Sequence, residues 1–269
     1  MGKIIVSDFN LGKTLDSGQI FRYGKDLVWY YIISRNKVFK VRQTGNVLEF
    51  KGATKKFIEN YFSLDFDFRT VSSYLSAEKQ LSSAFRLHKG IRIAKQDPWE
   101  CAVSFVCSSA SNIPRIKGCL NALAEQFGEK VVFDGETFYA FPEPGSINNS
   151  KKLAACRLGF RAKYVFELNK LADDKFFQKL RKMDYSSAKE KLVELPGIGD
   201  KIADCVLLFS LGFHEAFPVD VWIKRAMEEL YFGKKESSYK KIGEFAREHF
   251  GTYAGYAQQY LYHWRRMNG

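Results

Sequence analysis

A lysine that opens a predicted helix, directly after a loop rich in glycine and proline, lies where its amine could act as a nucleophile. The loop reads LPGIGD over residues 195–200, and Lys201 follows at once. Its glycines, Gly197 and Gly199, permit a tight turn and a close approach to another backbone. The main-chain N–H groups that begin the helix then point outward, where a phosphate can accept them. A helix-turn-helix buried in a core would have the same loop, so the loop alone leaves both interpretations open.

The helix after this loop is predicted to have two different faces. Lys201 and Cys205 are four residues apart and therefore share one face. The opposite stripe, formed by Ile202, Val206 and Phe209, is apolar and should face the core. An amine on the open face could attack an electrophilic carbon and form a covalent intermediate, although most lysines are simply solvated.

A carboxylate follows this helix in the segment PVDVW, residues 218–222. Asp220 lies nineteen residues after Lys201 and directly precedes a segment with helical periodicity. The simplest interpretation is an N-cap, because an aspartate side chain accepts hydrogen bonds from the first free N–H groups of a helix. A capping carboxylate can also stabilise positive charge that develops on a substrate during a reaction.

The charge of the chain indicates a polyanionic partner. Its 269 residues include 42 Lys and Arg against 30 Asp and Glu, which gives a formal net charge of +12. Such a surplus suits nucleic acid, because each neutralised phosphate releases counterions when the protein binds. A solvated basic surface would have the same composition, so charge alone does not decide between the two.

The cysteines and the apolar segments exclude several classes of protein. The five cysteines are scattered, with no C-x-x-C pair or Cys/His cluster, so we expect buried thiols in a reduced protein without metal or cofactor. No segment approaches the roughly 20 apolar residues of a membrane span, and the first residues do not resemble a signal peptide. We therefore expect a cytoplasmic protein, most simply a monomer.

The periodicity of the chain predicts an α+β fold. Residues 27–34, 37–43 and 46–50 are rich in β-branched and aromatic residues and predict an antiparallel meander. Helical periodicity dominates afterwards, so we expect an N-terminal antiparallel-sheet domain with short helices over residues 1–96 and a larger all-helical body over 97–269. The helices expected in the body cover residues 114–127, 150–156, 162–172, 174–183, 186–192, 201–211, 221–231, 239–250 and 253–267.

The motif L-P-G-I-G-D-K…P-V-D-V resembles the signature of helix-hairpin-helix DNA glycosylases, and the wider pattern from Gly18 to Tyr262 is similar to their 8-oxoguanine branch. The resemblance implies that Lys201 is the nucleophile and Asp220 the catalytic carboxylate. Relatives that use water lack this lysine, so the resemblance implies a bifunctional enzyme. Such an enzyme attacks C1′, forms a Schiff base and nicks the strand by β-elimination. The hairpin glycines and Trp222 are then expected along the DNA backbone.

Three further segments resemble the family's base pocket and its contacts with the opposite strand. In SGQIFR, the carbonyl of Gly18 would accept a hydrogen bond from N7–H, which 8-oxoguanine has and guanine lacks. Gln258 would bind the Watson–Crick edge, while Tyr262 and Cys205 would sandwich the base. For Tyr253, Tyr256 and Tyr260 we expect burial in the core instead.

The segment CSSASNIPR (residues 107–115) resembles the part of the family that fills the space left by the flipped base. Arg115 and Arg161 match arginines that contact the orphaned cytosine, and Phe160 lies where the family often has a wedging tyrosine. Ala110 departs from the pattern, because many relatives have an asparagine there. An alanine cannot fill the gap, so we expect a weaker preference for cytosine opposite the lesion.

The resemblance implies double-stranded DNA containing oxidised guanine as the partner. The absence of long termini and targeting signals fits a compact bacterial or archaeal protein, so we expect the enzyme on the nucleoid of such a cell. Two alternatives stay open. The first is a helix-hairpin-helix glycosylase for another damaged base, against which Gly18, Cys205 and Gln258 argue. The second is a non-catalytic DNA-binding protein, against which the pair Lys201 and Asp220 argues, since a carboxylate beside phosphates weakens binding.

Overall fold

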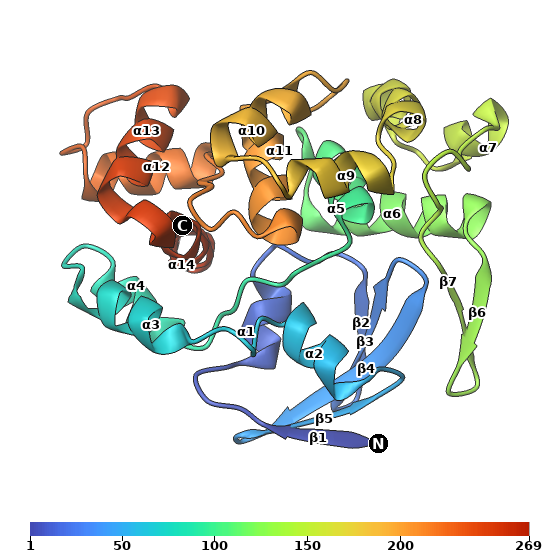
Figure 1. Cartoon of the computed structure of the whole chain (residues 1–269), viewed down its shortest axis with the longest axis horizontal. Helices are drawn as coiled ribbons and strands as arrows, with labels where there is room; N and C mark the ends of the chain where they lie inside the picture. Colours follow the sequence, from blue (N-terminus) through green and yellow to red (C-terminus); the bar gives the residue numbers. More distant parts are fainter. Residues whose placement is uncertain (269) are drawn as a thin grey trace.

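The computed structural model describes residues 1–268, and its N-terminal part is built on a five-stranded antiparallel sheet (Figure 1). The strand order within these residues is β1-β5-β4-β3-β2. The strands are β1 (Gly2–Ile5), β2 (Tyr23–Asp26), β3 (Trp29–Ser34), β4 (Lys37–Thr44) and β5 (Val47–Lys51). The predicted meander is confirmed as β3–β5, whereas β1 and β2 at the two edges were not predicted, because they are short and largely exposed.

One face of this sheet is buried beneath short helices. Strand residues Ile32, Phe39, Val41 and Leu48 are fully buried. They form a small core with helices α1 (Leu11–Asp16) and α2 (Lys55–Tyr61), which lie on the sheet in Figure 1. This packing fixes the turn after α1, which reaches from the sheet toward the helical body.

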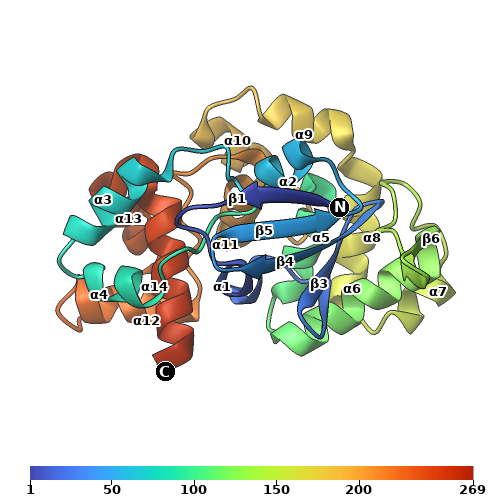
Figure 2. The ribbon, with the colours of Figure 1, turned by 90° about the horizontal axis from the view of Figure 1, so that it is seen from below.

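The larger core belongs to the helical body, and it also includes the helices α3 (Phe68–Ala77) and α4 (Ser82–Leu87). Figures 1 and 2 show these two helices beside the C-terminal helices rather than on the sheet. The other helices are α5 (Pro98–Ser108), α6 (Ile113–Phe127), α7 (Ser150–Ala155), α8 (Ala162–Leu171), α9 (Asp174–Leu180), α10 (Tyr185–Val193), α11 (Asp200–Val206), α12 (Val221–Leu230), α13 (Tyr239–Phe250) and α14 (Ala254–Asn268). The helices predicted after residue 97 are confirmed to within a few residues at their ends.

The body is not entirely helical, so that expectation was wrong at one place. Strands β6 (Lys130–Phe133) and β7 (Glu136–Tyr139) form a hairpin that projects from the end of α6 toward the sheet (Figure 1). The ring of Phe133 packs edge-on against Tyr31 of the sheet. Four-residue strands with exposed residues such as Val132 carry too little periodicity to be recognised in a sequence.

The helix that carries the predicted nucleophile changes its winding halfway. Residues 207–211, which continue α11, form a π-helical turn, and Gly212 then ends the helix with φ 88°. Such turns are rare and occur often at functional sites. Phe209 in this turn lines the same cavity as Lys201 and Cys205.

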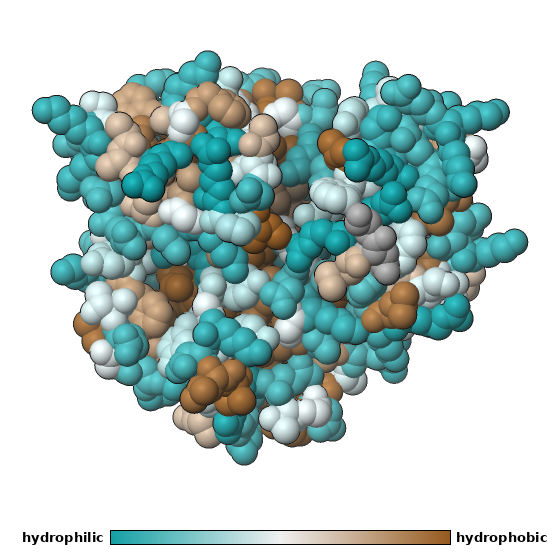
Figure 3. Space-filling view, turned by 180° about the vertical axis from the view of Figure 1, so that it is seen from behind, coloured by the Kyte–Doolittle hydropathy of each residue, from teal (hydrophilic) through white to brown (hydrophobic). Residues whose placement is uncertain are grey.

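The face of the molecule in Figure 3 is mostly hydrophilic and is hollowed near its middle, where hydrophobic side chains are exposed. Among the described residues, no helix is both long and apolar enough to cross a membrane.

Candidate active site

A cavity of about 600 Å³ lies between α5, α6, α11, α12 and α14. It contains both predicted catalytic residues and all four residues predicted for the base pocket. Those residues, together with Trp222, are Lys201, Asp220, Gly18, Cys205, Gln258 and Tyr262. Five segments that are far apart in the sequence therefore meet at one site. Its volume lies within the range of pockets that enclose a small molecule or a base.

Lys201, in the first turn of α11, contacts two residues of α5. Its Nζ donates to Oγ of Ser108 at 3.2 Å and lies 5.2 Å from the centre of the Phe105 ring. Lys201 and Cys205 share the open face of α11, while Val206 is fully buried, as their spacing predicts. Neither contact with α5 could be predicted, because Ser108 and Lys201 are 93 residues apart.

Asp220 has the capping role that its position suggested, and it also lines the cavity. It is the N-cap of α12, and its carboxylate accepts a hydrogen bond from the Ile223 N–H at 2.8 Å. Burial raises the pKa of Asp220, and the Ile223 hydrogen bond and the Lys201 charge oppose that shift. The cap holds the carboxylate still and leaves it on the wall of the cavity.

The turn at Gly18 and the ring of Tyr262 fit against each other closely. Gly18 has φ 81°, and a Cβ added to it would lie 2.8 Å from Cε1 of Tyr262. The side-chain amide of Gln259 donates to the carbonyl of Ser17 at 2.8 Å, which ties α14 to this turn. A glycine is therefore required here both by its conformation and by the ring beside it.

The other two pocket residues are more deeply buried. Gln258 is 5% exposed, and its amide nitrogen donates to the carbonyl of Pro218 at 3.2 Å. Its Oε1 has no protein partner among the described residues. Burial raises the pKa of the Cys205 thiol to about 12, while the nearby Lys201 lowers it, so the thiol is protonated at neutral pH. All five cysteines are buried free thiols, as expected.

The tyrosines assigned to the core lie there only in part. Tyr256 and Tyr260 are almost completely buried, and Tyr260 donates to the Ile91 carbonyl at 3.1 Å. Tyr253 is half-buried and packs against the ring of Tyr74.

The residues predicted to contact the opposite strand lie in two segments, 110–115 and 160–161, which are hydrogen-bonded to each other through Arg161 and Ala110. Phe160 is 55% exposed, and Ala110 is exposed with φ 45°. Arg115 is exposed at the start of α6. Arg161 is only 2% exposed, and its guanidinium donates to the carbonyls of Ser109 and Ala110. Its place in the site therefore differs from the open arginine that the resemblance implied.

The hairpin between α10 and α11 shows two different uses of glycine. Gly197 has φ 80°, and a Cβ there would lie 2.6 Å from Cβ of Tyr164. At Gly199, the N-cap of α11, a Cβ would meet nothing within 4 Å. The fold requires the first glycine. The second leaves open space before the N-terminus of a helix, where an anion can approach.

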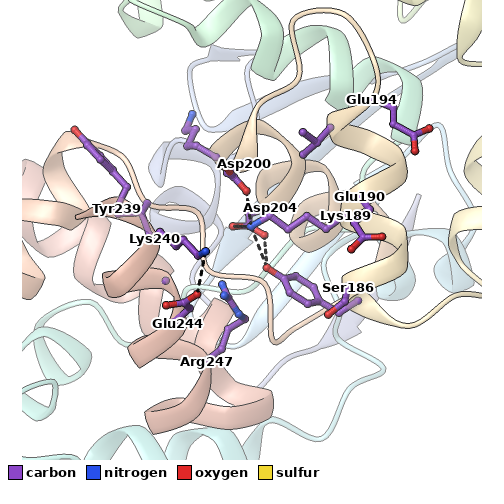
Figure 4. Close-up of a pocket in the computed structure, with 15 residues that line it drawn as sticks. Ser186, Lys189, Glu190, Glu194, Asp200, Asp204, Tyr239, Lys240, Glu244 and Arg247 are labelled. Atoms are coloured by element: carbon purple, nitrogen blue, oxygen red, sulfur yellow. Dashed lines mark hydrogen bonds and ion pairs between the residues drawn. The ribbon is translucent and has the colours of Figure 1, made fainter. Parts of the chain in front are cut away.

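A second, larger cavity of about 1010 Å³ lies on the other side of α11, between α10, α11 and α13 (Figure 4). Lys189 pairs there with Asp204 at 3.0 Å and with Asp200 at 3.4 Å. Asp204 also accepts a hydrogen bond from the Tyr185 hydroxyl at 2.6 Å. These contacts tie the two helices of the hairpin together.

Comparisons with known proteins place the chain in a family. A family model described as the N-terminal domain of 8-oxoguanine DNA glycosylase matches residues 3–102. A probable N-glycosylase/DNA lyase of Methanothermobacter thermautotrophicus is 34% identical over 235 residues, which cover 79% of this chain and 75% of that protein.

Solved structures agree with that placement. The 8-oxoguanine glycosylase/lyase of Clostridium acetobutylicum, bound to double-stranded DNA with cytosine opposite 8-oxoguanine, has a TM-score of 0.90 and 34% identity, over 97% of this chain and 93% of that chain. A structure described as MBOgg1 with a low-affinity DNA ligand has a TM-score of 0.91 and 36% identity, over 98% and 94%. The chain therefore belongs to the 8-oxoguanine DNA glycosylase/lyase family of the helix-hairpin-helix superfamily.

Proposed function

We propose that this enzyme removes 8-oxoguanine from double-stranded DNA with Lys201 as nucleophile and Asp220 as the catalytic carboxylate, and then nicks the strand. The observation that carries the proposal is that one cavity of base size holds a lysine amine and a capped, part-buried carboxylate. Both groups line the same wall as Gly18, Gln258 and Tyr262. A protein that only clamps phosphates has no use for this pair.

The reaction begins with the damaged nucleotide flipped into the cavity. The neutral amine of Lys201 attacks C1′, the bond from C1′ to N9 breaks, and the base leaves with the bonding electron pair and gains a proton. The carboxylate of Asp220 stabilises the positive charge that develops at the sugar. After the amine has lost one proton to the leaving base, the C1′–O4′ bond breaks, O4′ takes up a proton, and the nitrogen electron pair forms a protonated Schiff base with C1′. Loss of a proton from C2′ then expels the 3′ phosphate, and water releases Lys201.

The cavity wall supports a selective contact with the oxidised base. The carbonyl of Gly18 would accept a hydrogen bond from N7–H of 8-oxoguanine, whereas guanine would present an acceptor to it. An unpaired buried carbonyl costs about 1–3 kcal/mol, which disfavours guanine. Gln258 would read the Watson–Crick edge through Oε1, which is free of protein partners among the described residues. The ring of Tyr262 and the thiol of Cys205 would hold the two faces of the base.

Recognition of the opposite strand is proposed to be loose. Arg115 and the exposed ring of Phe160 remain available to DNA. Ala110 offers only a methyl group, and the donors of Arg161 already bind loop carbonyls. We therefore expect activity with partners other than cytosine opposite the lesion. An equally steep loss of activity with adenine, guanine and thymine would contradict this.

The test is covalent trapping on duplexes that each hold one lesion: 8-oxoguanine, an alkylated purine or an oxidised pyrimidine. Borohydride reduces a Schiff base to a stable protein–DNA adduct. We expect an adduct with 8-oxoguanine that is absent for K201Q. An adduct mainly with another lesion would assign a different damaged base, and binding without any adduct would indicate a non-catalytic DNA-binding protein. Nicking by K201Q would refute the nucleophile.

The organisation of the whole enzyme can also be proposed. We propose a monomer that acts in the cytoplasm on the nucleoid of a bacterial or archaeal cell, with a domain boundary near residue 96. The separate cores of the sheet and the helical body support a division into two parts, while helices α3 and α4, which precede residue 96, pack into the core of the body. Light scattering after gel filtration tests the monomer, because a dimer would double the measured mass.

A further inference from the structure

Ser108 connects the proposed nucleophile to the loop that begins at Ser109, which takes no part in the proposed reaction. It is the last residue of α5 and is half-buried beside the cavity. Its hydroxyl donates to the carbonyl of Phe105 at 2.7 Å and accepts from Nζ of Lys201 at 3.2 Å. These two bonds define the direction of its single proton.

The direction of that proton determines what Ser108 does to the amine. Because the proton points to the carbonyl of Phe105, the oxygen faces Lys201 with its lone pairs and can only accept. A neutral amine has two hydrogens, so it can donate one to Ser108 and keep its electron pair free for attack. The contact therefore orients Lys201 without consuming the electron pair that the reaction needs.

The loop that follows Ser108 is fixed from its far side. The buried guanidinium of Arg161 donates to the carbonyl of Ser109 through Nε at 2.8 Å and to that of Ala110 through Nη2 at 2.8 Å. Ser108 is therefore held by helix α5 before it and by this clamp after it. A side chain held at both ends is a firm support for a flexible lysine.

We propose that Ser108 is a positioning residue for Lys201, which holds the amine within reach of the sugar while the Arg161 clamp keeps the loop in place. The inference rests on the proposed role of Lys201. Without the hydroxyl, the four torsions of the lysine side chain are free, and fewer of its conformations place Nζ in line with C1′. Losing such orientation lowers the rate of the chemical step, while binding of the damaged duplex is unaffected.

The experiment compares S108A, S108T and wild type under single-turnover conditions, with a duplex that holds one 8-oxoguanine opposite cytosine. We expect S108A to lower the rate of base release by about 10- to 100-fold, with the duplex Kd within about twofold of wild type. S108T keeps a hydroxyl and should recover most of the rate. S76A is the matched control, because the exposed Ser76 bonds a main-chain carbonyl one turn earlier in α3 and lines neither of the two cavities.

Folding is checked by thermal melts, and S108C keeps the test decisive if S108A unfolds. A thiol is moderately larger than a hydroxyl and accepts hydrogen bonds only weakly, so S108C should be slow although folded. A rate for S108A or folded S108C within twofold of wild type would overturn the inference. Equal losses of rate and affinity, without recovery in S108T, would also overturn it.

K201Q and the double variant separate this inference from the proposed function. If Lys201 is the nucleophile, K201Q is inactive and adding S108A changes nothing further. Activity of K201Q would refute the proposed function. An inactive K201Q beside an S108A as fast as wild type would refute the positioning role alone.

Discussion

The two cavities that meet at α11 differ in how their charged side chains are paired. In the larger one, Lys189 bonds two aspartates, and Lys240 lies 4.0 Å from Glu244. In the smaller one, the amine of Lys201 bonds a neutral serine hydroxyl, and Asp220 accepts a main-chain N–H. Lys201 itself lines both cavities, so one helix separates a paired set of charges from an unpaired set.

This difference shows that volume does not identify the reactive site. Burial raises the pKa of Asp204, and Lys189 opposes that shift, so the charge of the larger cavity is used to hold α10 against α11. In the smaller cavity, Asp220 forms no ion pair within residues 1–268, although the Lys201 charge is near enough to lower its pKa. Its charge is available for a substrate.

The largest expected effect comes from removing one lysine from each cavity. K201Q should lower base release by at least about 1,000-fold, because the nucleophile is lost. K189Q should change that rate by less than about threefold, yet lower the free energy of unfolding by about 2 kcal/mol, because Asp204 loses its buried partner. Single-turnover nicking and urea denaturation measure the two effects. Similar rates for K201Q and K189Q would contradict the proposed difference between the two cavities.

Substitution of one aspartate from each cavity should also affect different properties, the rate for Asp220 and the stability for Asp204. D220N should slow base release by about 100-fold while the duplex still binds, because an amide does not stabilise a developing cation as a carboxylate does. D204N should keep the rate and cost about 1–2 kcal/mol in unfolding free energy, because Lys189 loses the more buried of its two carboxylate partners. A slow D204N with unchanged stability would mean that the larger cavity takes part in the chemistry.

The ionisation of Asp220 should be visible in the pH dependence of the rate. The carboxylate acts only when ionised, so its contribution is complete above its pKa in the folded protein and disappears as the pH falls through it. Because burial raises that pKa, the acid limb of the rate should lie at a higher pH than for an ordinary aspartate. D204N should retain this limb and D220N should lose it. If D220N keeps the acid limb of the pH–rate profile, another group is responsible for it.

The smallest effect is expected at the loop that closes the smaller cavity. Ala110 adopts φ 45°, which asparagine tolerates better than alanine. A110N should raise the preference for cytosine opposite the lesion by a few-fold and the Tm by a degree or two. A110G relieves the same backbone strain without an amide, so it should stabilise the loop and leave partner preference unchanged. A matching gain in preference for A110G would assign the effect to the backbone.

The residues that the sequence could predict are those whose spacing along a helix determines their neighbours. Lys201 with Cys205, and Gln258 with Tyr262, reach the same cavity because each pair shares a helix face. The capping role of Asp220 followed from its place before an amphipathic helix. The resemblance to the family motifs then predicted that these helix faces meet at one site.

The features that escaped prediction depend on contacts between distant segments. The bond from Lys201 to Ser108 spans 93 residues, and the clamp from Arg161 to Ala110 spans 51. An arginine in a sequence gives no sign that main-chain carbonyls will surround it. The edge strands and the β6–β7 hairpin were missed for a different reason, since too few of their side chains are buried to mark a period.

The fit of Gly18 against Tyr262 restricts how relatives of this chain can diverge. A side chain at position 18 needs a different backbone conformation and also space that the tyrosine ring occupies. One mutation cannot meet both conditions, so no neutral single step leads away from glycine. Across the family, any residue other than glycine at this position should therefore coincide with a smaller residue at the position of Tyr262. A lineage that acquires a new base preference through this turn would change the aromatic side first.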